Sequence, residues 1–225
     1  MGTGYEHDWE DPRLAAEGFV TDYIVWRLAK DGLEWHEAPD VPEGARIEHD
    51  AMRTTCEIFE ERNRNELIEL SEDLFADEGL HYEKYCQTVD AFGRRETDIQ
   101  DEMSFGRMVA FQVGLIAFAG LICVQKAKEG NRRELGLIAL YTSKYIDGKI
   151  RLTWIDSMRS WAGFVKMAEN VIARRSQPRG VVRQPAPPPA RQPPSRRSSL
   201  IFVATGVSLV GLGAFITHRV LTKSH

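Results

Sequence analysis

Cysteine is scarce in this sequence, and the pattern of its three cysteines excludes a disulfide framework. Cys56, Cys86 and Cys123 are odd in number and far apart in the chain. Each lies in a stretch of helical apolar spacing, so buried, reduced thiols are expected. Glycosylation sites of the Asn-X-Ser/Thr type are missing, and the acidic, polar N-terminus does not resemble a secretory signal. These absences favour a cytosolic location for the bulk of the chain.

Motifs that carry catalysis or bind metals are also missing. The six histidines form no His-x-x-x-His pair, and no Cys-x-x-Cys pair accompanies them. The sequence has neither a Gly-x-x-x-x-Gly-Lys phosphate loop nor a Gly-x-Ser-x-Gly elbow around a nucleophile. We therefore predict no catalytic residue, no metal and no cofactor, and an enzyme is not expected.

Positive charge is in deficit over most of the chain. Residues 1–175 carry 22 basic and 33 acidic side chains, whereas residues 176–225 carry seven basic side chains and no acidic one. A nucleic-acid-binding body needs a basic face, so this balance argues against DNA or RNA as a partner. A basic C-terminal region instead suits the anionic headgroups of a lipid surface.

Residues 200–217 read LIFVATGVSLVGLGAFIT and contain no charged side chain. Eighteen such residues reach the lower limit for a membrane-spanning helix, roughly 17–25 residues. Basic residues flank the segment on both sides, and residues 218–225 form only a short polar tail, so membrane insertion is expected to follow synthesis. A buried core helix is the alternative, but the three glycines of the segment suit a membrane helix better than a soluble one.

Residues 176–199 separate this hydrophobic segment from the rest of the chain. They contain seven of the ten prolines, a composition that favours extended conformers and cannot form a core. We interpret them as a disordered linker that holds the body away from the membrane. A proline-motif ligand for a signalling domain is the alternative interpretation.

The body of the chain, residues 16–175, shows apolar residues at helical spacing and no strand alternation. Residues 1–15 are predicted to be a flexible N-terminus. Within the body, Met108 to Val124 is apolar on nearly all sides, and a second apolar stretch, Leu135 to Tyr145, follows a turn at Gly130–Asn131. A helix of the first kind must be buried all round or lie in lipid. The sequence therefore predicts an all-α bundle around a central helical hairpin.

Four short segments of the body carry a family resemblance. They are Phe19 to Gly32 (FVTDYIVWRLAKDG), Ala51 to Arg62 (AMRTTCEIFEER), Met103 to Phe111 (MSFGRMVAF) and Trp154 to Phe164 (WIDSMRSWAGF). In this order they resemble the fourth, third, first and second homology motifs of the Bcl-2 family of apoptosis regulators. The aromatic-Gly-Arg core of the third segment is the most specific signal. Several phrases also resemble the nematode branch of that family.

The resemblance implies a Bcl-2-like helical bundle with a C-terminal transmembrane helix and a surface groove that binds partner helices. Arg107 would pair with the aspartate of a ligand helix, Gly106 would let its backbone approach, and Trp154 would cap a helix at one end. The implied groove residues are Phe59, Phe105, Gly106, Arg107, Val109, Ala110 and Trp154. The competing interpretation of Arg107 is a structural salt bridge at the start of a helix.

The sequence departs from the family pattern at several positions. Ser104–Phe105 stands where members usually have Asn-Trp, and Cys56 stands where a small residue is preferred. The usual Phe-Gly-Gly corresponds to Gly114-Leu115-Ile116, or to Phe118-Ala119-Gly120 if about one helical turn is inserted. Arg159–Ser160 replaces a small pair before the second tryptophan. These departures bear on the contour of the groove and on its ligand selectivity.

By this resemblance the chain is expected to be an anti-apoptotic regulator. Its expected partners are pro-apoptotic homology-three helix proteins and a caspase-activating ATPase adaptor, which it would restrain at a membrane. The mitochondrial outer membrane is the expected location, with the endoplasmic reticulum and nuclear envelope as alternatives. A pro-apoptotic pore former of the same fold is the alternative function. A tail-anchored trafficking or fusion protein is the third, but it would need long heptads beside the anchor, where the Pro-rich linker stands.

Overall fold

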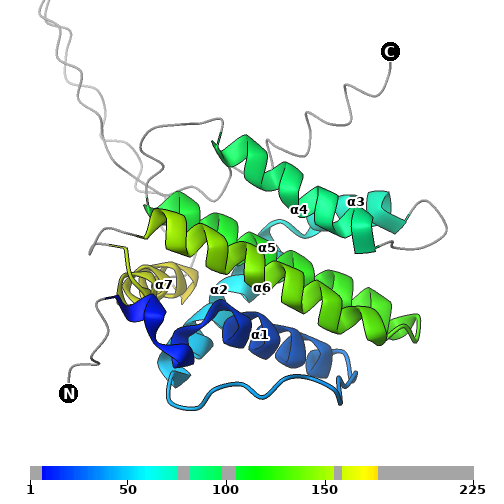
Figure 1. The fold of residues 1–225 in the computed structure, drawn as a ribbon, viewed down its shortest axis with the longest axis horizontal. Helices are drawn as coiled ribbons and strands as arrows, with labels where there is room; N and C mark the ends of the chain where they lie inside the picture. Colours follow the sequence, from blue (N-terminus) through cyan, green and yellow to red (C-terminus); the bar gives the residue numbers. More distant parts are fainter. Residues whose placement is uncertain (1–6, 76–81, 98–104, 155–158, 177–225) are drawn as a thin grey trace, which may run out of the picture.

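The computed structural model of the chain describes residues 7–75, 82–97, 105–154 and 159–176 (Figure 1). These residues form two short 3-10 helices and seven α-helices, and no strand occurs among them. The elements are η1 (Asp8–Glu10), η2 (Pro12–Leu14), α1 (Ala16–Lys30), α2 (Arg46–Arg62), α3 (Arg64–Phe75), α4 (Tyr82–Thr97), α5 (Phe105–Lys128), α6 (Arg133–Thr153) and α7 (Trp161–Ser176). The predicted all-helical body is therefore confirmed. The predicted membrane segment at 200–217, the short tail at 218–225 and the linker beyond Ser176 lie outside the described residues.

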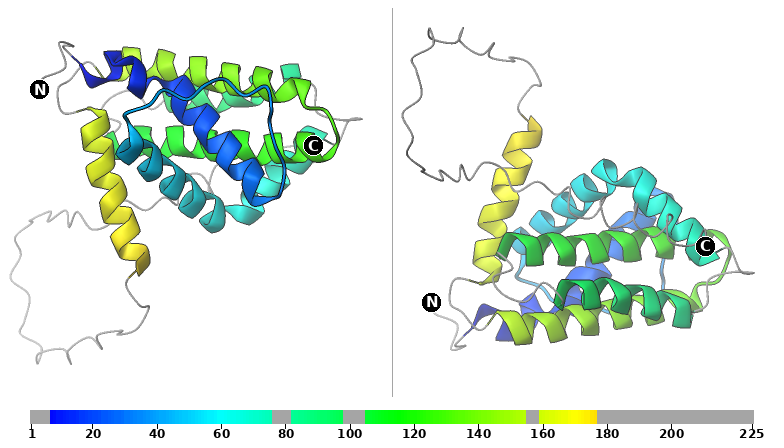
Figure 2. Two further views of the ribbon diagram at one scale, coloured as in Figure 1. Left: turned by 90° about the horizontal axis from the view of Figure 1, so that it is seen from below. Right: turned by 90° about the horizontal axis from the view of Figure 1, so that it is seen from above.

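Helices α5 and α6 form the predicted central hairpin. They lie in the middle of the bundle, with α1 against one side and α3 and α4 toward the other (Figures 1 and 2). The turn between them contains Gly130 at a φ of +79°, a conformation that glycine adopts without the strain of a Cβ. Helix α5 is long and apolar enough to cross a membrane, but 78% of its most apolar window is buried inside the protein. Its uniform hydrophobicity is thus explained by burial against α1, α2 and α6.

Helix α1 packs directly against the backbone of α5. The stripe formed by Phe19, Val20, Tyr23, Ile24 and Leu28 is almost completely buried. At Gly120 an added Cβ would lie only 2.7 Å from Cε1 of Tyr23, closer than side-chain atoms approach one another. The ring of Tyr23 has little freedom to move away, because its hydroxyl donates a hydrogen bond to Oε2 of Glu60 at 3.1 Å. Gly120 therefore permits this helix crossing by lacking a side chain.

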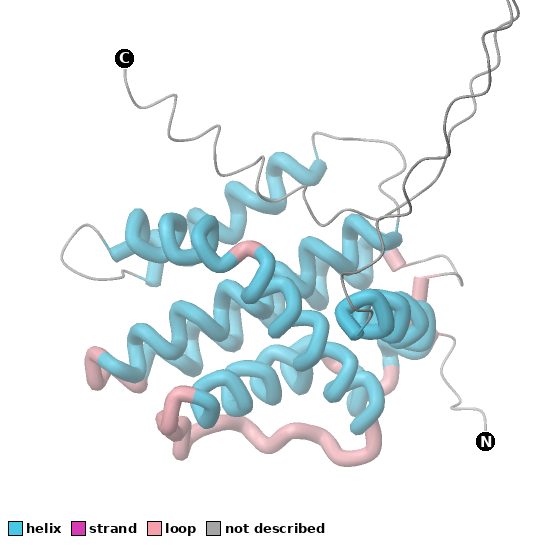
Figure 3. The backbone as a smooth tube through the Cα atoms, turned by 180° about the vertical axis from the view of Figure 1, so that it is seen from behind, coloured by secondary structure: helices cyan, strands magenta, loops and turns pink. Residues whose placement is uncertain are grey.

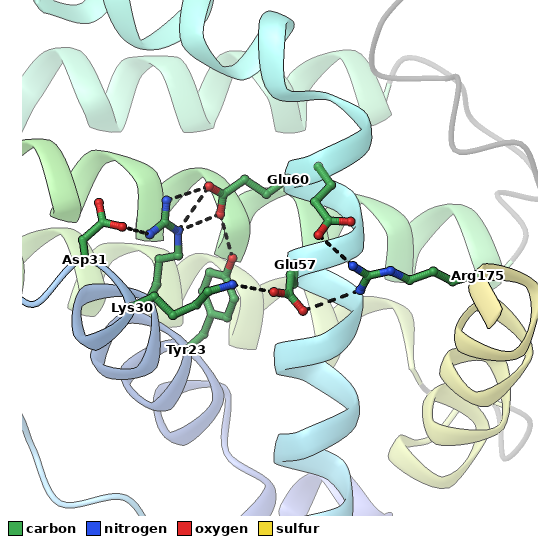
Figure 4. A network of polar contacts seen from close by, with 8 residues as sticks. Tyr23, Lys30, Asp31, Glu57, Glu60 and Arg175 are labelled. Atoms are coloured by element: carbon green, nitrogen blue, oxygen red, sulfur yellow. Dashed lines mark hydrogen bonds and ion pairs between the residues drawn. The ribbon is translucent and has the colours of Figure 1, made fainter.

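Ion pairs hold the outer face of α2 to its neighbours (Figure 4). The guanidinium of Arg27 on α1 grips the carboxylate of Glu60, with Nη2 at 2.9 Å from Oε1, and also contacts Asp31 at 3.0 Å. About one turn earlier on α2, Glu57 pairs with Lys30 of α1 and with Arg175 of α7. Nearer its start, Arg53 of α2 pairs with the buried Asp22 of α1. Several acidic side chains of the body therefore form ion pairs within the protein.

The N-terminal residues that the structure describes include two short helical turns before α1. Residues 8–10 and 12–14 form η1 and η2, and the described backbone as a whole consists of helices joined by loops (Figure 3). The second turn begins with Asp11, whose carboxylate accepts the amide of Arg13 at 3.0 Å, followed by Pro12 at the first helical position. An aspartate before a proline is a known helix-start signal.

Replacing Gly120 with alanine is expected to destabilise the protein by about 1–3 kcal/mol, because the new methyl group overpacks the α1–α5 crossing. Urea unfolding followed by circular dichroism measures the change. Gly148→Ala on α6 is the matched control, since an added Cβ there meets nothing within 4 Å. The control should stabilise the protein by up to about 1 kcal/mol through helix propensity. Equal stability of the two variants would contradict the close crossing.

Candidate functional site

The first turns of α5 present a narrow strip to solvent. Arg107 is exposed, while Gly106 and Ala110 are half-buried. Gly106 and Ala110 are four residues apart and lie on one face of the helix, where their small side chains leave room for an approaching backbone. Val109 is only 8% exposed and packs into the core. This strip is the place where a partner helix could contact α5 closely.

Arg107 has no carboxylate within ion-pair distance among the residues that the structure describes. Its guanidinium stands in the first turn of α5, and the neighbouring residues 105–111 carry no acidic side chain. A free arginine beside small residues can make a bidentate contact with a carboxylate of a partner. The described part of the chain therefore supplies no partner for the competing interpretation, a structural salt bridge.

Aromatic side chains close one end of the strip. Phe105 is partly buried and packs edge-on against Trp154, with ring centroids 5.2 Å apart. Trp154 in turn packs edge-on against Trp161 at 5.0 Å, and Trp161 lies 4.2 Å from Phe19 of α1. We call Phe105, Trp154, Trp161 and Phe19 the aromatic column. Trp154 is the C-cap residue of α6 and is fully buried, so its backbone and ring both belong to the wall at this end.

Helix α2 lies behind the strip and turns its apolar face inward. Phe59 is completely buried in the core and exposes no surface of its own. Cys56 is also completely buried, and its Sγ lies 3.6 Å from the carbonyl oxygen of Val113 on α5. The contact explains why a small side chain is needed at this position, and burial raises the pKa of the thiol well above its ordinary value.

The three cysteines are free, as the sequence predicts. Cys56 and Cys123 are buried, but Cys86 on α4 is only half-buried, which differs from the expectation for that residue. Helix α4 packs mainly on α6, so part of its surface stays open to solvent. Among the described residues no group of three or more His, Cys, Asp or Glu side chains could hold a metal ion.

A cavity of about 280 Å³ lies elsewhere, between α1, α2, α3 and α5. None of the predicted groove residues lines it, and its walls are mainly the charged side chains of the α1–α2 network. Arg27 is already paired with Asp31 and Glu60 there, and Lys30 is paired with Glu57. Because these charges are satisfied within the protein, the strip on α5 is the better candidate for partner binding.

Sequence reasoning missed two residues at the end of the strip, Asp8 and Trp9. The indole Nε1 of Trp9 donates to the carbonyl oxygen of Trp154 at 3.2 Å. The amide of Ala162 donates to Oδ2 of Asp8 at 3.2 Å. These contacts join positions about 150 residues apart, and neither belongs to a periodic stripe. The only local signal was the Asp-Pro pair just downstream, which marks a helix start.

Comparison with known proteins shows which family this chain resembles. The family model described as "Apoptosis regulator proteins, Bcl-2 family" matches residues 52–161, from α2 to the first residue of α7. The chain is 34% identical over 166 residues to apoptosis regulator ced-9 of Caenorhabditis briggsae, covering 73% of this chain and 60% of the relative. It is 31% identical to apoptosis regulator ced-9 of Caenorhabditis elegans, covering 97% of this chain and 75% of the relative. The chain belongs to the Bcl-2 family of apoptosis regulators.

A solved structure of this family extends the similarity to three dimensions. A crystal structure of a CED-9/EGL-1 complex matches with a TM-score of 0.66 at 31% identity, covering 76% of this chain and 100% of that chain. Helices α1, α2, α5 and α7 therefore carry most of the described residues of the four motifs inferred from the sequence. In the second alignment considered for the Phe-Gly-Gly motif, Gly120 is the residue where α1 packs against the α5 backbone.

Proposed function

We propose that this chain is an anti-apoptotic Bcl-2 protein that binds pro-death homology-three helices at the strip on α5. The observation that carries the proposal is the exposed Arg107 beside Gly106 and Ala110, in a chain that is 31% identical to a CED-9 crystallised in complex with a partner. The complex supports partner binding as the role of this fold. The strip supplies the chemistry that such binding needs.

Binding would divide the work among three groups of residues. Arg107 sets the register of the ligand helix by pairing with its aspartate, an interaction stronger and more directional than a lysine contact. Gly106 and Ala110 let the ligand backbone approach. Phe105 and Trp154 form the end wall, while the buried Val109 holds the strip to the core. An amphipathic helix with anchors at i, i+3 or i+4, and i+7 fits such a surface.

Replacing Arg107 with alanine is expected to weaken binding of a homology-three peptide by about tenfold or more, on the order of 1.5–3 kcal/mol. The loss follows from removing the charged partner of the ligand aspartate. Isothermal titration calorimetry with the wild-type peptide measures it.

Arg133→Ala is the matched control for this substitution. Arg133 is also an exposed arginine in the first turn of a helix, but it stands at the opposite end of the central hairpin. Its removal should leave peptide affinity within about twofold, because salt screens surface charges that are farther apart than the Debye length. Unchanged affinity of a folded Arg107→Ala variant would refute the assigned role.

The alternative function, pore formation, is suggested by the hydrophobic α5, which is long enough to cross a bilayer. In the described structure this helix is buried under α1 and α2, and the Gly120 crossing favours the closed bundle. We also infer that residues 200–217 anchor the chain in an intracellular membrane, with the mitochondrial outer membrane as the proposed location.

Dye-loaded vesicles containing anionic lipid test both inferences. The full chain is expected to bind the vesicles without leakage, and to suppress leakage caused by a pore-forming relative. A chain lacking residues 200–225 should lose most vesicle binding because the uncharged segment is gone. Leakage triggered by adding a homology-three peptide would instead support the pore-forming function.

We further propose that the chain restrains a caspase-activating ATPase adaptor at the membrane, on the basis of its similarity to the two ced-9 proteins. Affinity capture from cytosol, with the body lacking residues 176–225 as bait, is expected to retain this adaptor. The same capture with an unrelated acidic protein is the control. Absence of the adaptor from captures that do retain homology-three proteins would contradict this part of the proposal.

A further inference from the structure

We propose that Asp8 and Trp9 form a clip that positions the end wall of the ligand-helix groove. The inference rests on the proposed function, because it concerns how the groove is kept ready for its ligand. It adds two residues to the site that contact no ligand themselves and lie outside the four homology motifs. They would act through Trp154 and Phe105.

The first half of the clip is a long-range helix cap. The first four amides of a helix lack intrahelical partners. At the start of α7, Ser160 Oγ accepts the amide of Gly163 at 3.0 Å, and Asp8 Oδ2 accepts the amide of Ala162 at 3.2 Å. A local residue thus satisfies one amide, while Asp8 satisfies another from 154 residues away. A carboxylate at this end of a helix is also favoured by the helix dipole.

The second half secures the end of α6. Trp154 is the C-cap residue there, and its carbonyl oxygen, which is beyond the helical ladder, accepts the indole N–H of Trp9 at 3.2 Å. The guanidinium of Arg151 lies over the Trp9 ring at 5.3 Å from its centroid, and the His7 ring stacks on the same indole with ring centroids 5.2 Å apart. Two adjacent residues therefore hold both helix ends that flank the α6–α7 junction.

The aromatic column transmits this restraint to the groove. Phe105 touches Trp154, and Trp154 touches Trp161, so each ring is fixed by its neighbours. Protein interiors are close-packed, and a shift of the Trp154 backbone cannot be absorbed without moving the rings beside it. Phe105 stands two residues before Arg107 on α5. Loosening the clip would therefore disturb the end wall and the residue that reads the ligand charge.

Asparagine should replace Asp8 in this role. Burial raises the pKa of the Asp8 carboxyl, against the hydrogen bonds from the amides of Ala162 and Trp161 that favour its charged form. The side chain acts as a hydrogen-bond acceptor in a partly desolvated place, and a neutral amide oxygen can accept the same bond. Asn and Asp are equally good N-cap residues. Asp8→Asn is thus a rescue variant for Asp8→Ala.

The test measures binding of a synthetic homology-three peptide to the full chain by titration calorimetry. Asp8→Ala is expected to weaken binding by about 3- to 10-fold, and Trp9→Phe, which keeps a ring but loses the N–H, by about threefold. Asp8→Asn should restore affinity to within about twofold. Ile138→Val is the stability control, because it trims a buried side chain on α6 far from Trp154 and costs comparable stability.

A second measurement needs no ligand. The indole N–H resonances of Trp154 and Trp161 in a two-dimensional NMR spectrum should shift in Asp8→Ala and Trp9→Phe, and stay in place in Ile138→Val. Unmoved resonances would overturn the clip, whether or not the wild-type protein binds the peptide. Failure of the wild-type protein to bind the peptide would overturn the proposed function and leave the resonance test of the clip intact. Shifted resonances with unchanged peptide affinity would overturn the link between the clip and the groove, as would equal losses of affinity in Asp8→Ala and Ile138→Val.

Discussion

Burial of α5 is the constraint on which the rest of this structure depends. A helix of 24 residues that is apolar on nearly every side cannot face water, so other helices must cover it. Helices α1, α2 and α6 do so, and Gly120 lets α1 approach until its Tyr23 ring meets the α5 backbone. The exposed strip near the start of α5 is the exception. There the surface of the helix consists of Gly106, Arg107 and Ala110, and none of the described helices covers it.

Helix α2 connects this core to the surface. Its inward face places Cys56 and Phe59 against α5, and its outward face ties Glu57 and Glu60 to α1 and α7 through ion pairs. The acidic character of the body therefore has a structural use, because arginines on neighbouring helices take up these carboxylates. Most of the charged side chains that line the cavity beside this network, such as Arg27, Lys30 and Glu60, already have partners. Its size alone does not make it a binding site.

The proposed binding site lies where helix ends meet. The start of α5, the end of α6 and the start of α7 come together around Phe105, Trp154 and Trp161. Helix ends carry backbone groups without intrahelical partners, and they need partners from elsewhere in the chain. Asp8 and Trp9 provide two of them. The end wall of the proposed groove is thereby held by two residues outside the proposed contact surface.

The sequence by itself determined the helical class, the central hairpin, the stripe on α1 and the family, because periodicity and short motifs are local properties. It also predicted Arg107 and Trp154 as groove residues, since both stand in recognisable motifs. Only the tertiary structure decided that Phe59 lies wholly in the core, that Gly120 marks a helix crossing and that Cys86 is partly open. It alone brought Asp8 and Trp9 to the groove's end wall. These outcomes depend on contacts between distant segments, which no local pattern records.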